Sequence, residues 1–100
     1  MLRLFRVSGN SMQPTYSAGD VLLTRRVQAP SVDDIVVVNT DDVGLIVKRI
    51  ERLGSDSVTL VGDNPRLASS CCERPHSYRS IVGKVICRLK LPFSFARRRS

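Results

Sequence analysis

The sequence predicts an all-β fold within a single small domain. One hundred residues, of which 42% are hydrophobic, suffice for one modest core and leave no room for a second folded module. Short runs of β-branched and other apolar residues recur between turn residues, and no segment shows the clear periodicity of an amphipathic helix. We therefore expect residues 1–91 to form the domain, with a basic C-terminal tail over residues 92–100.

Three strands are expected in the first forty residues. Residues 1–7 alternate apolar and basic side chains with the period of two that is typical of a strand. After turn residues at 17–20, a second strand covers residues 21–27 and ends where Pro30 interrupts the chain. Residues 35–38 are a β-branched run without polar interruption, which indicates a strand covered on both faces and close to the middle of the fold.

The second half of the chain predicts three more strands. Turn residues at 39–42 reverse the chain, so that residues 43–50 form the return strand of a hairpin. Residues 57–61 and a longer run at residues 81–91 have the same strand-like composition. The sequence contains no internal repeat that would indicate a different architecture.

A small polar loop at residues 7–15 separates two of the apolar runs and holds the first candidate for chemistry. Ser11 lies between Gly9 and Pro14, where the backbone is sharply bent and a hydroxyl can be presented to a substrate. A serine in such a loop is more often only a turn residue. Its interpretation as a nucleophile therefore depends on a base elsewhere in the chain.

Lys48 is the candidate base. In the expected strand at residues 43–50 it projects on the same side as Ile46 and Ile50, and it is one of only three lysines among sixteen basic residues. Apolar surroundings lower the pKa of a lysine amine, whereas arginine stays protonated, so a lysine on this face can accept a proton from a serine. The alternative is a lysine whose stem covers the two isoleucines while its amine reaches water.

Histidine and cysteine chemistry is less favoured. His76, the only histidine, lies in a turn-rich segment, where we expect a solvated loop residue rather than the base of a histidine triad. Cys71, Cys72 and Cys87 have the spacing of neither a disulfide framework nor a zinc site, which indicates a reducing compartment. An intermolecular bond or a Cys71–Cys87 disulfide stays open. We expect no metal and no cofactor.

The net charge of +7 gives a weak indication of partners, because the terminal Arg97-Arg98-Arg99 supplies three of these charges and reads as a solvated tail. No aromatic residues are interleaved with the basic ones, so we expect no nucleic-acid partner. No apolar run is long enough to span a membrane, so we expect a cytoplasmic protein without an integral membrane anchor. The sequence does not determine the oligomeric state.

Successive motifs, in the right order from residue 7 to about residue 85, resemble those of type I signal peptidases. They read Gly9-Asn10-Ser11-Met12-Gln13-Pro14-Thr15 with Gly19-Asp20, Asp34-Ile35-Val36-Val37, Val47-Lys48-Arg49-Ile50, Val61-Gly62-Asp63-Asn64-Pro65 and Ile81-Val82-Gly83-Lys84-Val85.

This resemblance implies that Ser11 is the nucleophile and Lys48 the general base of a Ser-Lys dyad. It also implies a catalytic fold of coiled antiparallel sheets, shared with the processing domain of LexA-type repressors. The implied activity is endopeptidase cleavage of a precursor polypeptide after small residues, commonly with alanine at the positions one and three before the cut.

The chain is most similar to the short members known as nickel-type superoxide dismutase maturation proteases. It resembles them in length, in reaching the serine motif almost at once, and in its Gly-Asp-Asn-Pro sequence. The resemblance implies removal of an N-terminal leader from a cytoplasmic precursor. The nickel then belongs to the substrate, and the protease needs no metal.

One element of the family pattern is missing. The Ser-x-Asp-Ser-Arg sequence that supports the lysine is replaced at residues 68–74 by Ala-Ser-Ser-Cys-Cys-Glu-Arg, in which Ser69 or Ser70 remains able to hydrogen-bond the Lys48 amine. Asp63 and Asn64 are expected to shape a turn near the site rather than to react.

The remaining loop residues are expected to support the serine. Ser8, Gly9, Asn10, Met12 and Pro14 surround it, and the amide N–H of Ser11 is the expected donor to the oxyanion. Because Gly9 has no hydroxyl, backbone donors must suffice there unless Ser8 reaches in.

Two other functions stay open. A LexA-like self-cleaving domain needs a small-residue pair that can reach the serine, and Ala18-Gly19 lies too close to Ser11 in the chain, so we favour an enzyme that acts on other proteins. A catalytically inactive peptide-binding module of the same fold is the other alternative, raised by the altered segment that contains Ser69 and Ser70.

Overall fold

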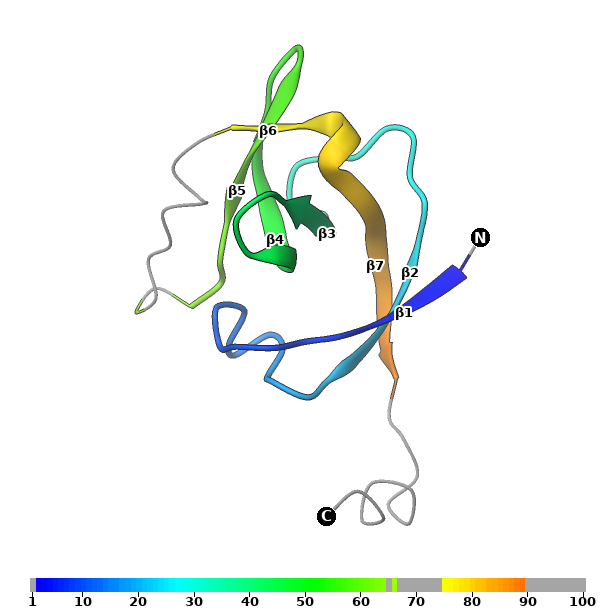
Figure 1. Ribbon diagram of the computed structural model, residues 1–100, viewed down its shortest axis with the longest axis vertical. Coiled ribbons are helices and arrows are strands. Elements are labelled where there is room, and N and C mark those ends of the chain that lie inside the picture. Colours follow the sequence, from blue (N-terminus) through cyan, green and yellow to red (C-terminus); the bar gives the residue numbers. More distant parts are fainter. Residues whose placement is uncertain (1, 65, 67–74, 90–100) are drawn as a thin grey trace.

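The computed structural model describes residues 2–64, 66 and 75–89, and it confirms the all-β prediction (Figure 1). Apart from one three-residue 3-10 turn, all regular secondary structure in these residues is β-strand. The elements are β1 (Leu2–Arg6), β2 (Val21–Arg25), β3 (Ile35–Thr40), β4 (Gly44–Leu53), β5 (Ser57–Val61), β6 (His76–Ser77), the 3-10 turn η2 (Tyr78–Ser80) and β7 (Ile81–Leu89).

The seven strands form one antiparallel sheet in the order β1-β2-β7-β3-β4-β5-β6. The sheet is strongly coiled, so that β1 runs across β2 and β7 in Figure 1. This coiling brings the loop after β1 to the end of β5, although β1 is the first strand of the sheet and β5 the sixth. The backbone N–H of Asn64 donates to the Ser11 carbonyl at 2.8 Å across this junction.

β3 is the fourth strand of seven and is covered on both faces, as its β-branched run predicts. Val37 faces one core, which we call the serine-side core, and Val36 and Val38 face the other, the hairpin-side core. Each buried aliphatic side chain of this kind contributes about 1.5–3 kcal/mol. The serine-side core consists of Val7, Met12, Leu22, Val37, Val47 and Val85, and the hairpin-side core of Val36, Val38, Ile50, Val58 and Leu60.

The expectation for His76 is wrong. This residue is 9% exposed and lies in β6, where it pairs with Val58 of β5, rather than in a solvated loop. A strand of two residues is too short to show a period of two, so its sequence carries only the turn signal of the neighbouring Pro75.

Strand ends differ from the prediction by a few residues. β4 continues to Leu53, because Arg52 and Leu53 pair with β5, whereas β2 ends at Arg25, the last residue paired with β1 and β7. The last strand is described as far as Leu89, and the predicted tail at residues 92–100 lies outside the described residues.

Candidate active site

Ser11 lies in the loop between β1 and β2, and this loop is held at its base and at its centre. At the base, Val7 donates its N–H to the Asp20 carbonyl and accepts from the Gly19 N–H, both at 2.8 Å. At the centre, the Met12 side chain is 1% exposed within the serine-side core. Ser11 is half-buried beside this anchored neighbour, so the core of the domain sets the position of its hydroxyl.

Gly9 turns the chain into the loop. Its φ is +80°, in the left-handed region that glycine adopts readily and that other residues adopt only at a cost. Nothing lies within 4 Å of the place where a Cβ would stand. The backbone conformation, rather than a lack of space, therefore requires glycine at this position.

Lys48 lies in the middle of β4, directly opposite Val36 of β3. It shares a face with Ile46 and Ile50, which pack in or against the hairpin-side core. Lys48 itself is 3% exposed. The alternative in which its amine extends into water therefore does not describe this structure.

Ser11 and Lys48 both lie close to Gly62, the residue that follows β5. A Cβ on Gly62 would stand 3.3 Å from the Lys48 amine nitrogen and 3.5 Å from the Ser11 Cβ. It would also stand only 2.8 Å from the Ser11 carbonyl oxygen. The Lys48 amine and the Ser11 side chain therefore both lie next to Gly62, which has no side chain to fill the space beside them.

Asp63 ties the serine loop to β4. Arg49 donates to its carboxylate from Nε at 2.8 Å and from Nη2 at 2.7 Å, and the Thr15 hydroxyl also donates to it. The Arg49 hydrogen bonds hold the pKa of Asp63 below its usual value, and they raise the pKa of Arg49 in return. The carboxylate thus joins the serine loop, β4 and the end of β5.

Asn64 holds the serine loop from the same turn. Its backbone N–H donates to the Ser11 carbonyl at 2.8 Å, and its side-chain Nδ2 donates to the Asn10 carbonyl at 2.9 Å. Its Oδ1 accepts the Arg66 N–H at 3.0 Å, which is the local turn-shaping bond expected of such a residue. Asn64 therefore both shapes its own turn and fixes the backbone on either side of the candidate nucleophile.

The other candidate residues have plainer positions. Ser8, Asn10 and Pro14 are exposed parts of the loop, and the Gln13–Pro14 peptide bond is cis. Met12 acts on the loop through its buried side chain. Ser69 and Ser70, with Cys71 and Cys72, lie outside the described residues.

Sequence reasoning gave no role to three residues that shape the site, namely Thr15, Arg49 and Gly62. All three belong to motifs that were recognised, but their contacts join segments far apart in the chain. Arg49 follows the candidate lysine, and Asp63 lies in the candidate turn. Their opposite charges were the one signal in the sequence that could have indicated their ion pair.

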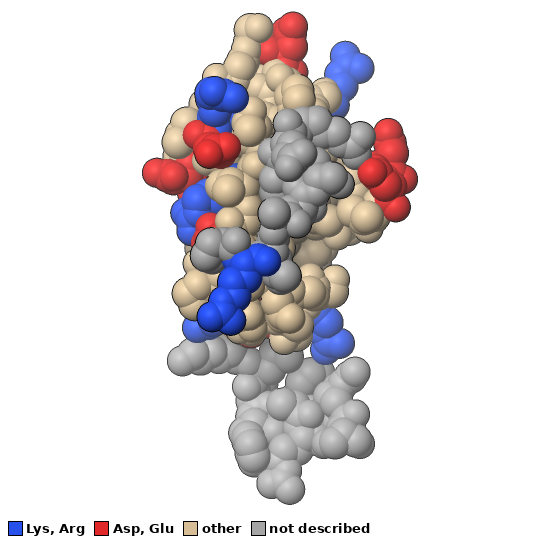
Figure 2. Space-filling view, turned by 90° about the vertical axis from the view of Figure 1, so that its left-hand side faces the viewer, with Lys and Arg blue, Asp and Glu red and all other residues tan. Residues whose placement is uncertain are grey.

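One face of the molecule carries charges of both signs. Figure 2 shows the side of the molecule that lies on the left in Figure 1, and there the described Lys and Arg side chains are intermixed with Asp and Glu. Within the described part of the chain, no three His, Cys, Asp or Glu residues are grouped so as to hold a metal ion. In the same residues, no helix has the length and apolarity that crossing a membrane requires.

Comparison with known proteins identifies the family. No curated protein matches the chain. A family model described as Peptidase S24-like matches residues 2–86, which include β1 to β6, the turn η2 and most of β7. The match supports the LexA-like catalytic fold and, at this coarser level, a serine peptidase. With a match over most of its length, the chain belongs to the Peptidase S24-like family.

Proposed function

We propose that this protein is a serine endopeptidase in which Ser11 is the nucleophile and Lys48 the general base. The observation that carries the proposal is the approach of the two side chains to one point beside Gly62, with Lys48 removed from water. A lysine amine beside a serine hydroxyl can take its proton and so replace the histidine of a catalytic triad. The family match supports the same class of enzyme.

In the proposed mechanism, the Lys48 amine takes the proton of the Ser11 hydroxyl as Oγ attacks the carbonyl carbon of the cleaved peptide bond. The negative charge that develops on the carbonyl oxygen is stabilised by the Ser11 amide N–H. The Lys48 ammonium then gives its proton to the leaving nitrogen, the C–N bond breaks and an acyl-enzyme remains. Lys48 next accepts a proton from water, which hydrolyses the ester and restores the Ser11 hydroxyl.

The proposed substrate is a precursor polypeptide with small residues before the cut, from which the enzyme removes an N-terminal leader. The motif Gly62-Asp63-Asn64-Pro65 favours the leader of a nickel-type superoxide dismutase precursor in the cytoplasm, by its resemblance to the maturation proteases. In this proposal the enzyme uses no cofactor, because the lysine supplies all the proton transfer that the reaction needs.

The test uses two substrates, read by mass spectrometry. One is a peptide that spans the leader junction of a nickel superoxide dismutase precursor, and the other is a peptide library with alanine at the positions one and three before the cut. We expect a single cut after a small residue in the junction peptide. Cleavage of the library without cleavage of the junction peptide would support the endopeptidase activity and contradict the proposed superoxide dismutase precursor as its substrate.

Variants of the two residues test the dyad. Ser11→Ala and Lys48→Arg should each lower the cleavage rate by at least about 1,000-fold, since arginine stays protonated. Lys48→Met removes the amine with little change of side-chain volume. If this variant keeps the wild-type melting temperature, its loss of activity comes from the missing base and not from poorer packing. Full activity of Lys48→Arg would contradict the dyad. Inactivity of the unmodified enzyme on both substrates, with peptide binding intact, would favour the inactive binding module.

A further inference from the structure

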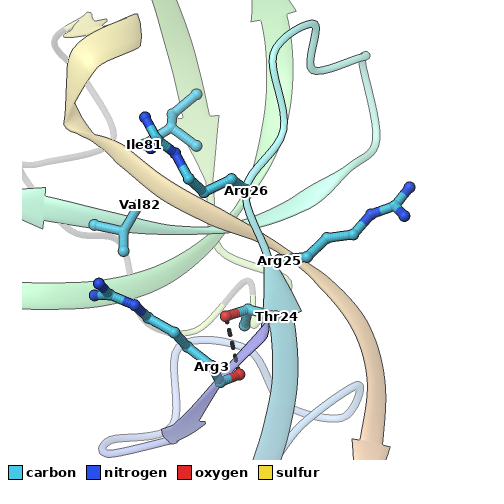
Figure 3. A pocket seen from close by; sticks show the side chains of 6 residues that line it. All are labelled: Arg3, Thr24, Arg25, Arg26, Ile81 and Val82. Atoms are coloured by element: carbon cyan, nitrogen blue, oxygen red, sulfur yellow. Dashed lines mark hydrogen bonds between the residues drawn. The ribbon is translucent and has the colours of Figure 1, made fainter. Parts of the chain in front are cut away.

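A pocket lies away from Ser11, between the beginning of β1, the end of β2 and the beginning of β7 (Figure 3). Its volume is about 380 Å³. The Thr24 hydroxyl donates to the Arg3 carbonyl at 3.1 Å, which holds β1 against β2 at this place. The pocket is lined by Arg3, Thr24, Arg25, Arg26, Ile81 and Val82.

The pocket combines positive charge with an apolar wall. In Figure 3 the side chains of Arg3 and Arg26 lie on the side of β2 where Ile81 and Val82 also lie, whereas Arg25 points away. Among the described residues, no carboxylate lies within ion-pair distance of Arg3 or Arg26, although Arg49 and Arg88 have such partners. The pocket therefore presents two uncompensated guanidinium groups, each able to bind a carboxylate through two hydrogen bonds.

Strand β1 connects this pocket to the candidate active site. Side chains alternate along a strand, so Arg3 faces the same side as Phe5, which packs against the serine-side core. The pairing of β1 with β2 leaves its other edge without a strand among the described residues. An extended peptide could lie along this free edge of β1 with its cleaved bond at Ser11. A residue of that peptide roughly five or six positions from the cleaved bond would then lie beside Arg3.

We propose that the pocket receives an acidic side chain of the peptide substrate, with Arg3 and Arg26 as specificity-determining residues. This inference rests on the proposed peptidase function and adds a substrate class to it: precursors with Asp or Glu about five or six residues from the cut. The guanidinium groups bind the carboxylate, and Ile81 and Val82 cover the aliphatic part of the same side chain. Uncompensated charges beside the peptide's path favour this occupant over a neutral or basic residue.

The test measures binding separately from cleavage. The Ser11→Ala protein holds peptides without cutting them, so fluorescence anisotropy reports their affinity. The probes are labelled peptides with alanine at the positions one and three before the cut and with glutamate or lysine at the fifth and sixth positions on one side of the cut or the other. We expect the matching glutamate peptide to bind about tenfold more tightly than its lysine counterpart, and this advantage to shrink as salt is added.

Charge reversal identifies the residues. Arg3→Glu with Arg26→Glu, in the Ser11→Ala background, should reverse the preference and give the lysine peptide the higher affinity. A misfolded protein cannot gain affinity for a new peptide, so this result does not depend on stability alone. The control is Arg52→Glu, which makes the charge change of one of these two substitutions at an exposed position of β4 and should keep the glutamate preference.

Three results would overturn the proposal. The first is equal affinity for glutamate and lysine peptides, and the second is an equal loss of preference in Arg52→Glu, which would assign the effect to net charge. The third is binding of vesicles containing phosphatidylserine through Arg3 and Arg26 without any peptide preference, which would assign the pocket to a lipid headgroup. If the protein with Ser11 intact cleaves the glutamate and lysine peptides equally well, the proposed role of the pocket is wrong and the proposed peptidase activity is supported. If it cleaves neither peptide while the glutamate preference in binding, and its reversal by the charge change, are still observed, the proposed peptidase activity is wrong and the role of the pocket is supported.

Discussion

Replacing Gly62 by alanine should damage catalysis more than it damages the fold. The new methyl group would stand 2.8 Å from the Ser11 carbonyl oxygen and 3.3 Å from the Lys48 amine nitrogen. Ordinary contact begins at about 3.4 Å, so the Ser11 carbonyl has to move by roughly half an ångström. That carbonyl already accepts the Asn64 N–H at 2.8 Å, so the movement also strains the bond that holds the loop.

The expected magnitude follows from this displacement. A misplacement of about 1 Å between reacting groups can cost on the order of 100-fold in rate, so we expect kcat to fall by roughly 10- to 100-fold. Overpacking of a filled site costs about 1–3 kcal/mol in the free energy of unfolding. Most of the variant therefore stays folded at room temperature while it loses activity.

The assay measures kcat on a neutral peptide and the free energy of unfolding in urea. Gly83→Ala is the matched control, because its methyl group would stand 3.1 Å from the Arg25 carbonyl oxygen and 3.3 Å from the Thr24 hydroxyl, in the contact between β7 and β2. We expect this control to lose similar stability and to keep its kcat. Wild-type kcat in Gly62→Ala, or an equal loss of kcat in Gly83→Ala, would refute the reasoning.

Further predictions concern the groups that hold the serine loop. Asp63→Asn should lower the free energy of unfolding by about 1–2 kcal/mol at neutral pH, measured in urea, because Arg49 and Thr15 lose a charged acceptor. The lowered pKa of Asp63 means that its carboxylate stabilises the fold above the ordinary value of 3.8 and ceases to do so as pH falls through the folded-state pKa. The difference in unfolding free energy between the two proteins should therefore shrink below about pH 4, and a constant difference would contradict this account. Met12→Ala should cost about 2–5 kcal/mol and lower the melting temperature, whereas Met12→Leu should cost less than about 1.5 kcal/mol and keep peptidase activity. Equal effects of the two Met12 substitutions would show that its burial does not position Ser11.

Local pattern was sufficient to predict six of the seven strands and the strand face on which Lys48 lies. The uninterrupted β-branched run at residues 35–38 identified the central strand, because only a strand covered on both faces has no place for polar side chains. Alternation placed Lys48 on the face of Ile46 and Ile50, where the structure buries it.

Long-range pairing could not be predicted in the same way. The position of β7 between β2 and β3 depends on which strands meet when the sheet coils, and no local period encodes that choice. The contacts of Asp63 with Arg49 and Thr15 depend on the same coiling, so the sequence showed a turn where the structure has a cross-link. His76 was mistaken for a loop residue because its partner in the sheet, Val58, lies far away in the chain.

The coiled sheet places Lys48 and Ser11 on parts of the molecule that should open with different free energies. Lys48 lies in a strand hydrogen-bonded on both sides, next to the central β3, so its amide should exchange with solvent only on global unfolding. Ser11 lies in a loop held by Met12, Asn64 and the base of the loop, and this unit can detach while the sheet stays intact. Hydrogen exchange should therefore show faster exchange for the Ser11 loop than for the Lys48 strand. Such local detachment would separate the proposed nucleophile from the proposed base well below the melting temperature, so heat should abolish the proposed peptidase activity before it unfolds the domain.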